Sequence, residues 1–214
     1  MKVTDLMKTD EMESRDKLEP GNQGYSFYAY LSRMRYISRW GLMRNSCPEN
    51  IQEHSHMVAV LAHALALISR QIFGNQTIDP DKCATAALFH DAGEIITGDL
   101  PTPIKYFSPE IRSAYKQVED VAAEKLLDML PQELRDCYRP ILQEEDKEIQ
   151  RFVKAADKLS AHIKCLEELK ASNHEFILAA RQTRQALEEM DMPEIRYFME
   201  QFLDSFTLTL DELQ

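Results

Sequence analysis

Two histidines and two aspartates in this 214-residue sequence have the residue types expected of a divalent-metal site. His90 and Asp91 are adjacent on a predicted helix of small and apolar residues, and His54 lies in the first turn of an earlier predicted helix. Asp157 lies within a largely apolar helical stretch, where an unpaired carboxylate is costly unless a cation or hydrogen-bond donors accompany it. Imidazole nitrogens and carboxylate oxygens from three helices suit a transition metal with positions open for water and substrate.

Each of these residues also has a simpler interpretation. A His-Asp pair arises easily by chance, and His90 could be packed at a helix end beside a solvated Asp91. Asp157 could form a salt bridge with a neighbouring lysine. Glu94 follows Asp91 by three residues, which on a continuous helix places its carboxylate on a neighbouring part of the same surface. Because several metal-binding residue types occur together on these predicted helices, the metal site is favoured over the simpler interpretations.

The elements that must position these residues are predicted to be helices. Asn50 and Glu53 have capping-box spacing, and the apolar residues that follow predict a helix over residues 51–73. Asp79 followed by Pro80 indicates a second helix start, and Gly98 is the expected end of that helix. Two prolines and a glycine predict an extended loop over residues 97–103. Further helices are expected over residues 25–38, 109–129, 131–145, 147–170, 174–190 and 193–206.

Composition supports an all-α fold. The sequence has only 6 glycines, and no run of β-branched residues alternates with polar ones. Hydrophobic residues make up 44% and charged residues 29% of the chain, which excludes wholesale disorder. We expect residues 1–24 to be a flexible tail and residues 25–214 to form one domain.

The charge balance bears on the partners and the location of the protein. A net charge of −11 without a long basic run argues against polymeric nucleic acid and anionic membrane as partners. A small phosphorylated ligand then needs a local cation or a metal. The longest nearly apolar stretch, residues 57–69, is too short to span a bilayer, and the N-terminal residues lack the apolar core of a signal peptide. We therefore expect a cytoplasmic protein, whose four widely spaced cysteines are reduced and structural.

The order of the candidate ligands resembles the H…HD…D signature of the HD-domain metallophosphohydrolases. The flanking sequence is similar, more specifically, to that of the bacterial YfbR-type 5′-deoxynucleotidases, from about Phe27 to the C-terminus. The stretches that carry this resemblance are RWGLMRN (39–45), EHS (53–55), TGDLPTP (97–103), KYF (105–107) and KCLEEL (164–169).

The resemblance implies a fold, an activity and a set of roles. The fold is an HD-domain multi-helix bundle, in a homodimer with one divalent transition metal per subunit, such as cobalt or manganese. The activity is hydrolysis of deoxyribonucleoside 5′-monophosphates to the deoxynucleoside and phosphate. Arg39 would grip the phosphate, and Trp40 would pack where a ribose 2′-hydroxyl would otherwise lie. Glu94 and Asp99 match residues at the reaction centre, and the implied metal ligands are His54, His90, Asp91 and Asp157.

These residue types fit the implied chemistry. The planar fork of Arg39 can hold two phosphate oxygens, and two acids can serve the attacking water and the departing 5′ oxygen. We assign these two proton-handling roles to Glu94 and Asp99 jointly. For Trp40 the simpler alternative is packing. Arg44 and Lys105 stay outside the catalytic set, and the remaining histidines are interpreted as core or surface residues (His56, His63, His162 and His174).

Two other functions are compatible with the same ligands. Another HD phosphohydrolase could act on a nucleoside triphosphate or a guanosine polyphosphate alarmone, and its product would differ: tripolyphosphate or pyrophosphate in place of phosphate. A non-catalytic HD regulatory module could bind a nucleotide without turnover. The presence of all four ligand positions and two further acids argues against the regulatory module.

Overall fold

A computed structural model of the chain describes residues 24–105 and 107–213. These residues form helices and no β-strand, apart from one isolated antiparallel bridge between Ser38 and Asn50, so the predicted all-α class is confirmed. The predicted tail lies outside the described residues except for Gly24. The α-helices are α2 (Phe27–Leu31), α3 (Ile51–Gln71), α4 (Pro80–Phe89), α5 (Glu94–Thr97), α6 (Thr102–Lys105), α7 (Pro109–Asp128), α8 (Gln132–Leu142), α9 (Lys147–Lys170), α10 (Ile177–Glu189) and α11 (Pro193–Gln201). The 3-10 helices are η3 (Ser32–Tyr36), η4 (His174–Phe176), η5 (Leu203–Thr207) and η6 (Leu210–Leu213).

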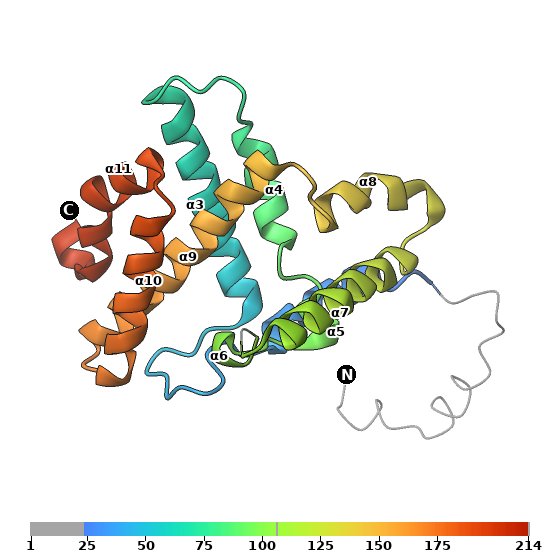
Figure 1. The fold of residues 1–214 in the computed structure, drawn as a ribbon, viewed down its shortest axis with the longest axis horizontal. Coiled ribbons are helices and arrows are strands. Elements are labelled where there is room, and N and C mark those ends of the chain that lie inside the picture. Colours follow the sequence, from blue (N-terminus) through green and yellow to red (C-terminus); the bar gives the residue numbers. More distant parts are fainter. Residues whose placement is uncertain (1–23, 106, 214) are drawn as a thin grey trace, which may run out of the picture.

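Helices α3, α4 and α9 cross at the centre of the molecule, and on one side α10 packs against α9 and α11 against α3 (Figure 1). The main core lies between these helices, where apolar residues spaced by three and four positions face one another. Leu65 of α3, Ala87 of α4 and Leu159 of α9 are fully buried in it. Phe198 of α11 belongs to the same core, whereas Phe202 is 46% exposed.

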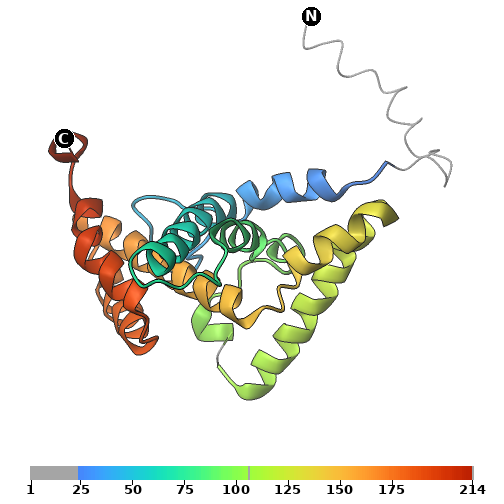
Figure 2. The same ribbon diagram turned by 90° about the horizontal axis from the view of Figure 1, so that it is seen from above.

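Helices α7 and α8 project from this centre as a second unit of packing (Figure 2). Leu126 and Leu127 of α7 are buried against Phe27 of α2 and Ala92, which lies just after α4. Residues 90–93 therefore connect the main core to this second cluster. The candidate metal ligand His90 lies at that junction.

The helices that carry the candidate ligands begin where the sequence predicts. Asn50 accepts a hydrogen bond from the Glu53 backbone, and the Glu53 side chain bonds back to the Asn50 backbone, which completes the capping box of α3. Asp79 caps α4, with Pro80 at its first position. These caps place His54 in the first turn of α3 and His90 at the C-terminal end of α4.

The prediction of one continuous helix from Pro80 to Gly98 is wrong between His90 and Gly93. Helix α4 ends at Phe89, residues 90–93 form turns, and Glu94 begins the separate helix α5, which Gly98 ends with φ 73°. The Ala87 carbonyl that would bond to Asp91 in a continuous helix instead accepts bonds from the backbone and the ring Nδ1 of His90. Glu94 is therefore not on the helix surface that carries His90.

Other predicted boundaries also need correction. The first helix gives way at Ser32 to η3 and ends at Tyr36 rather than near residue 38. The loop predicted over residues 97–103 is shorter, because α6 begins at Thr102 with Pro103 in its first turn, where the missing N–H of proline costs little. The helices predicted at 174–190 and 193–206 each include a 3-10 segment, and α8 spans Gln132–Leu142 rather than 131–145.

All four cysteines are free, as predicted for reduced residues. Cys83 and Cys165 are buried, which agrees with structural roles, whereas Cys47 and Cys137 are exposed. Within the described ranges, the helices include none with the length and apolar character needed to cross a membrane.

A buried carboxylate fastens the loop between η3 and α3 to helix α9. Glu168 is fully buried and pairs with Lys164 one turn earlier. It also accepts hydrogen bonds from the backbones of Ser46 and Cys47 and from the Asn173 amide. Although burial acts to raise the pKa of Glu168, these donors hold it at about 2, so the carboxylate stays ionised.

Replacing Glu168 with alanine should lower the free energy of unfolding by about 3–5 kcal/mol, because Lys164 would remain buried without its partner. Chemical denaturation followed by circular dichroism measures this change. The matched control is Glu188→Ala, which breaks the exposed i,i+4 pair with Arg184 and should change stability little. Equal effects of the two substitutions would contradict the structural role of Glu168.

Candidate metal centre and active site

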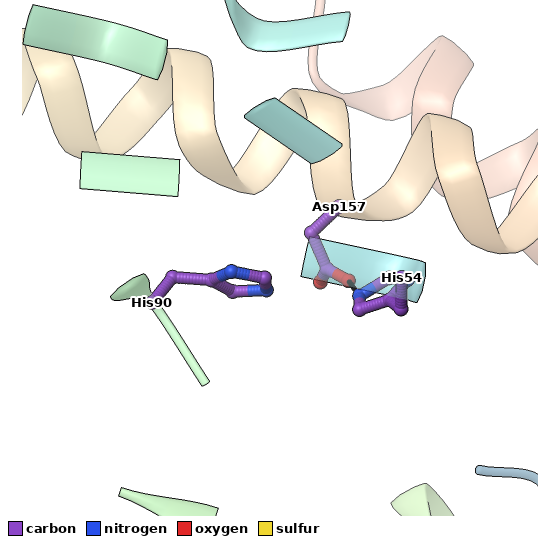
Figure 3. A group of neighbouring side chains, drawn as sticks. All are labelled: His54, His90 and Asp157. Carbon is purple, nitrogen blue, oxygen red and sulfur yellow. Dashed lines mark hydrogen bonds and ion pairs between the residues drawn. The ribbon is translucent and has the colours of Figure 1, made fainter. Parts of the chain in front are cut away.

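Three of the predicted ligands meet at one point between the central helices. His54 comes from the first turn of α3, Asp157 from the middle of α9, and His90 from the end of α4 (Figure 3). One ligand atom from each lies within 4.8 Å of the others. The His54 Nε2 atom lies 3.1 Å from Asp157 Oδ1. Two imidazoles and a carboxylate thus converge at one point.

Hydrogen bonds at the opposite ring nitrogens orient both imidazoles. His90 Nδ1 lies 2.6 Å from the Ala87 carbonyl oxygen, so Nδ1 carries the hydrogen and Nε2 faces the cluster. His54 Nδ1 lies 3.2 Å from the Ser160 hydroxyl, which can donate or accept and so accompanies either tautomer of the ring. Such bonds are typical of metal-ligating histidines.

One buried ring nitrogen of His90 tests whether a metal fits here. His90 Nε2 is buried and has no hydrogen-bond partner among the described residues, although Asp91 Oδ2 lies 3.2 Å away without the alignment of a hydrogen bond. A divalent cation would satisfy this nitrogen. The donor set of imidazole and carboxylate groups also suits such a cation, so the residues present fit the metal that the sequence implied.

Asp91 lies beside the cluster but is not one of the three residues that meet within 4.8 Å. Its Oδ2 atom is 3.7 Å from His54 Nε2 and 3.4 Å from Arg39 Nη1. The Asp91 carboxylate therefore joins the predicted metal ligands to the predicted phosphate-binding arginine. The structure brings all four predicted ligands together, with Asp91 at the side that faces Arg39.

The electrostatic environment keeps the carboxylates of the predicted ligands Asp91 and Asp157 ionised. Burial acts to raise the pKa of Asp157, whose side chain is 37% exposed, but the hydrogen bond and charge of His54 lower it well below the usual range. Burial also acts to raise the pKa of Asp91, but the charge of His90 outweighs this effect and lowers the pKa of Asp91. Burial lowers the pKa of His90, but Asp91 raises it more, to about 9. Two ionised carboxylates therefore lie where a cation would bind, and in the metal-free protein the protonated ring of His90 lies beside them.

The two predicted acids lie beyond these ligands. Glu94 begins α5, and Asp99 follows Gly98 in the next loop. Burial, with repulsion from Asp91 and Asp99, raises the pKa of Glu94 to about 9, and its Oε2 atom is buried without a hydrogen-bond partner among the described residues. Burial also raises the pKa of Asp99, against the opposing charge of Arg39. Both acids are thus near the charges of the centre but outside the metal cluster.

Helix α7 holds the loop that carries Asp99. The Tyr115 hydroxyl lies 3.3 Å from the Gly98 carbonyl oxygen, to which it donates, and 3.3 Å from the Thr97 hydroxyl. Lys105 lies over the Tyr115 ring, 4.6 Å from its centre, and pairs with Glu119. The arm formed by α7 therefore positions one of the two predicted acids.

Arg39 and Trp40 lie in the turn after η3, on the Asp91 side of the cluster. Trp40 has φ 58°, a left-handed conformation that costs a bulky residue about 1–3 kcal/mol and persists only when surrounding contacts enforce it. Its ring packs against Phe176, with the ring centres 5.3 Å apart. Loss of hydration lowers the pKa of Arg39, but surrounding carboxylates, led by Asp91, raise it above its usual value. Arg39 remains a cation.

Sequence reasoning missed Glu49 and Ser160. Glu49 accepts hydrogen bonds from the side chains of both Arg39 and Trp40, and Ser160 contacts His54 Nδ1. Ser160 could have been found, because it follows Asp157 by three residues and so lies on the same face of α9. Glu49 is one of many acidic residues, and its position relative to the other candidate residues follows no sequence pattern that would indicate a role in the site.

The residues left out of the site lie in the core or on the surface. Arg44 has a 94% exposed side chain and pairs with Glu175. His162 is buried, with its Nδ1 atom 2.9 Å from the Thr183 hydroxyl. His56 and His174 are exposed on the surface. These placements agree with their interpretation as core or surface residues.

The helical fold that carries this cluster is an HD-domain fold. The fold is similar to that of an HD-domain phosphohydrolase from Listeria innocua, with a TM-score of 0.74 and 21% identity over 85% of this chain and 88% of the other. It is also similar to the HD phosphohydrolase DatZ of cyanophage S-2L, solved with dA and one catalytic Zn²⁺ ion. That match has a TM-score of 0.58 and 22% identity, and covers 83% of this chain and 96% of DatZ.

Within this class, the chain belongs to the 5′-deoxynucleotidase YfbR-like family, whose model matches residues 26–206. A 5′-deoxynucleotidase from Vibrio parahaemolyticus is 50% identical over 192 residues, which cover 87% of this chain and 97% of the relative. The family expected from the sequence motifs is therefore confirmed.

Proposed function

We propose that this protein is a metal-dependent 5′-deoxynucleotidase that hydrolyses deoxyribonucleoside 5′-monophosphates to the deoxynucleoside and phosphate. The observation that carries the proposal is the juxtaposition of a metal-binding cluster with an arginine. Arg39 Nη1 reaches the Asp91 carboxylate, which itself contacts two histidines of the cluster. A cation site and a phosphate-binding guanidinium are thus adjacent, and the family match and the named relative agree with this chemistry.

His54, His90, Asp91 and Asp157 hold the divalent cation in this proposal. When bound, the cation supplies a Lewis acid for the phosphoryl oxygens and lowers the pKa of a coordinated water. The Ala87 carbonyl and the Ser160 hydroxyl hold the two imidazole rings in the ligating orientation.

The remaining residues bind the substrate and handle protons. Arg39 places its NH₂ groups on the phosphate oxygens and stabilises the charge that develops on them. Glu94, which keeps its proton because of its burial, is suited to donate to the departing 5′ oxygen. Asp99 is then the acid that orients the attacking water. Trp40 closes the space that a ribose 2′-hydroxyl would need.

Phosphate release from paired deoxyribo- and ribonucleoside 5′-monophosphates tests the function. Chelated protein is resupplied separately with cobalt, manganese, magnesium or zinc, and each pair is assayed at equal concentration. We expect metal-dependent release that favours the deoxy member. Release of tripolyphosphate or pyrophosphate from other nucleotides, with none from monophosphates, would assign a different HD phosphohydrolase activity. Binding without any product would assign the regulatory module.

Replacing Trp40 with alanine should reduce the preference for deoxyribose by about 10-fold to 100-fold, because the ribose hydroxyl would no longer meet the indole. The ratio of kcat/KM for the deoxy and ribo members of one pair measures this effect. Trp40→Phe is the matched control, since it keeps an aromatic ring against Phe176 and should retain more of the preference. An equal loss of rate on both sugars would show that Trp40 is only structural.

The finer properties expected from the sequence belong to the same proposal. They are a homodimer, one cobalt, manganese or similar ion per subunit, a cytoplasmic location, and a single domain over residues 25–214. Analytical ultracentrifugation and metal analysis of the purified protein test the first two.

A further inference from the structure

Glu49, the second residue before α3, connects the two predicted substrate-binding side chains. Its Oε2 atom accepts a hydrogen bond from Arg39 Nε at 3.1 Å and another from Trp40 Nε1 at 3.0 Å. Its other oxygen, Oε1, lies 4.0 Å from Nδ1 of the predicted metal ligand His54. One partly buried carboxylate thus contacts both substrate-binding residues and lies beside the metal cluster.

The backbone fixes Glu49 relative to these two residues. The Arg39 amide donates to the Glu49 carbonyl oxygen at 2.9 Å, and the Ile51 amide donates to the Ile37 carbonyl oxygen at 3.0 Å. Together with the bridge between Ser38 and Asn50, these bonds lay the two segments side by side. The Glu49 side chain therefore acts from a fixed base, and its bonds can hold Arg39 and Trp40 in one orientation.

For Arg39, the bond to Glu49 selects which edge of the guanidinium faces the substrate. Glu49 accepts the hydrogen bond from Arg39 Nε, and Asp91 Oδ2 lies 3.4 Å from Arg39 Nη1. A planar guanidinium anchored at Nε cannot rotate about its long axis without breaking that bond. The Nη1 group is thereby held on the Asp91 side, where the metal ligands and the phosphate would be.

For Trp40, the bond to Glu49 fixes the rotation of the indole. The indole N–H is a donor only, and Glu49 is its acceptor, while the ring packs against Phe176. The left-handed backbone at Trp40 is unfavourable and needs such contacts to persist. Without Glu49, the only one of these two restraints left on the indole would be its packing against Phe176.

We propose that Glu49 is a positioning residue that couples phosphate binding to sugar discrimination, because the same oxygen atom orients Arg39 and Trp40. The inference rests on the proposed deoxynucleotidase function and deepens it. It requires hydrogen-bond acceptance rather than negative charge. A glutamine amide oxygen can accept both bonds, whereas alanine can accept neither.

The experiment compares Glu49→Ala and Glu49→Gln in the full-length protein loaded with the metal that best supports wild-type activity. The matched control is Glu167→Gln, which removes the same charge from the cavity of about 200 Å³ that Glu49 and Glu167 both line. Glu167 has no hydrogen bond to Arg39 or Trp40 among the described residues. If circular dichroism shows that Glu49→Ala does not fold, Glu49→Met replaces it.

Two measurements report on the two consequences. The first is kcat and KM for one deoxyribo- and ribonucleoside 5′-monophosphate pair. The second is the fluorescence of Trp40, the only tryptophan in the chain, with its quenching by acrylamide. The fluorescence reports on the indole without metal or substrate, so it tests the positioning even if the wild-type protein hydrolyses neither nucleotide, an outcome that refutes the proposed function instead.

For Glu49→Ala we expect kcat on the deoxy substrate to fall about 100-fold and the deoxy-to-ribo ratio of kcat/KM to fall at least about tenfold. Its indole should become more accessible to the quencher. Glu49→Gln should stay within about tenfold of wild type in kcat and keep the ratio and the fluorescence, as should Glu167→Gln. The proposal is overturned if Glu49→Gln is as defective as Glu49→Ala, since charge would then be the cause. It is equally overturned if Glu49→Ala keeps the wild-type ratio and fluorescence.

Discussion

Replacing His90 with alanine is expected to lower phosphate release from a deoxyribonucleoside 5′-monophosphate by about 1,000-fold or more. His90 supplies the buried Nε2 atom that has no hydrogen-bond partner among the described residues, within a group whose ligand atoms lie within 4.8 Å of one another. Alanine removes that nitrogen and leaves an incomplete set of ligands. The reaction then loses the Lewis acid and the activated water that a bound cation supplies.

Metal content separates this explanation from simple unfolding. His90→Ala should bind less metal than wild type, and added metal should raise its melting temperature less, because a ligand that binds the folded state more tightly stabilises it more. The matched control is His56→Ala, which removes an exposed imidazole two residues from His54 and should keep both metal and activity. Wild-type rates from His90→Ala, or from chelated wild-type protein, would refute the metal mechanism.

The positions of the candidate ligands could largely be predicted because local rules govern them. A capping box fixed the start of α3 and placed His54 in its first turn, and an aspartate-proline pair fixed the start of α4, although the end of α4 at His90 was not predicted. Asp157 indicated a site because a charged residue in an apolar helical stretch needs a partner. The structure gives it a buried histidine partner at 3.1 Å in place of the alternative lysine.

What the sequence did not reveal depends on contacts between distant segments. The end of α4 at Phe89 follows from the His90 ring, which bonds to the Ala87 carbonyl while its other nitrogen faces the metal cluster. The spacing of apolar residues does not reveal that the His90 ring competes with the helix backbone for the Ala87 carbonyl. The role of Glu49 depends on the pairing of its segment with residues 37–39, and Glu168 depends on a loop that lies 121 residues away along the chain.

The separation of Glu94 from the His90 helix has a consequence for its chemistry. On a continuous helix, Glu94 would have shared a surface with its neighbours. At the start of a separate short helix, it is buried, and its Oε2 atom has no hydrogen-bond donor among the described residues. Burial and the nearby Asp91 and Asp99 charges then raise its pKa to about 9. The same break in the helix that made the sequence prediction wrong thus creates a carboxyl that keeps its proton at neutral pH.

Glu94→Gln is therefore expected to lower kcat about 100-fold to 10,000-fold, because an amide of the same shape cannot transfer the proton. As the proton donor, wild-type Glu94 loses function when it ionises, so the wild-type rate should fall on the alkaline side of the pH profile. A bound cation lowers the pKa of a neighbouring carboxyl, which places this fall below pH 9 in the loaded enzyme. The residual activity of Glu94→Gln should lack the alkaline fall. Loss of the acidic limb instead would make Glu94 the base and Asp99 the acid.

Stability gives an independent measure of the same proton in the metal-free protein. The unfolded chain releases the Glu94 proton near pH 4.5 and the folded chain releases it near pH 9, so between these values the folded state binds one more proton at this residue. The Glu94 contribution to the free energy of unfolding must then decrease as pH rises through this window. Glu94→Gln does not titrate, and its stability advantage over wild type should grow from pH 5 to pH 9. Urea denaturation of both proteins across this range measures the difference, and a constant difference would show that Glu94 has an ordinary pKa.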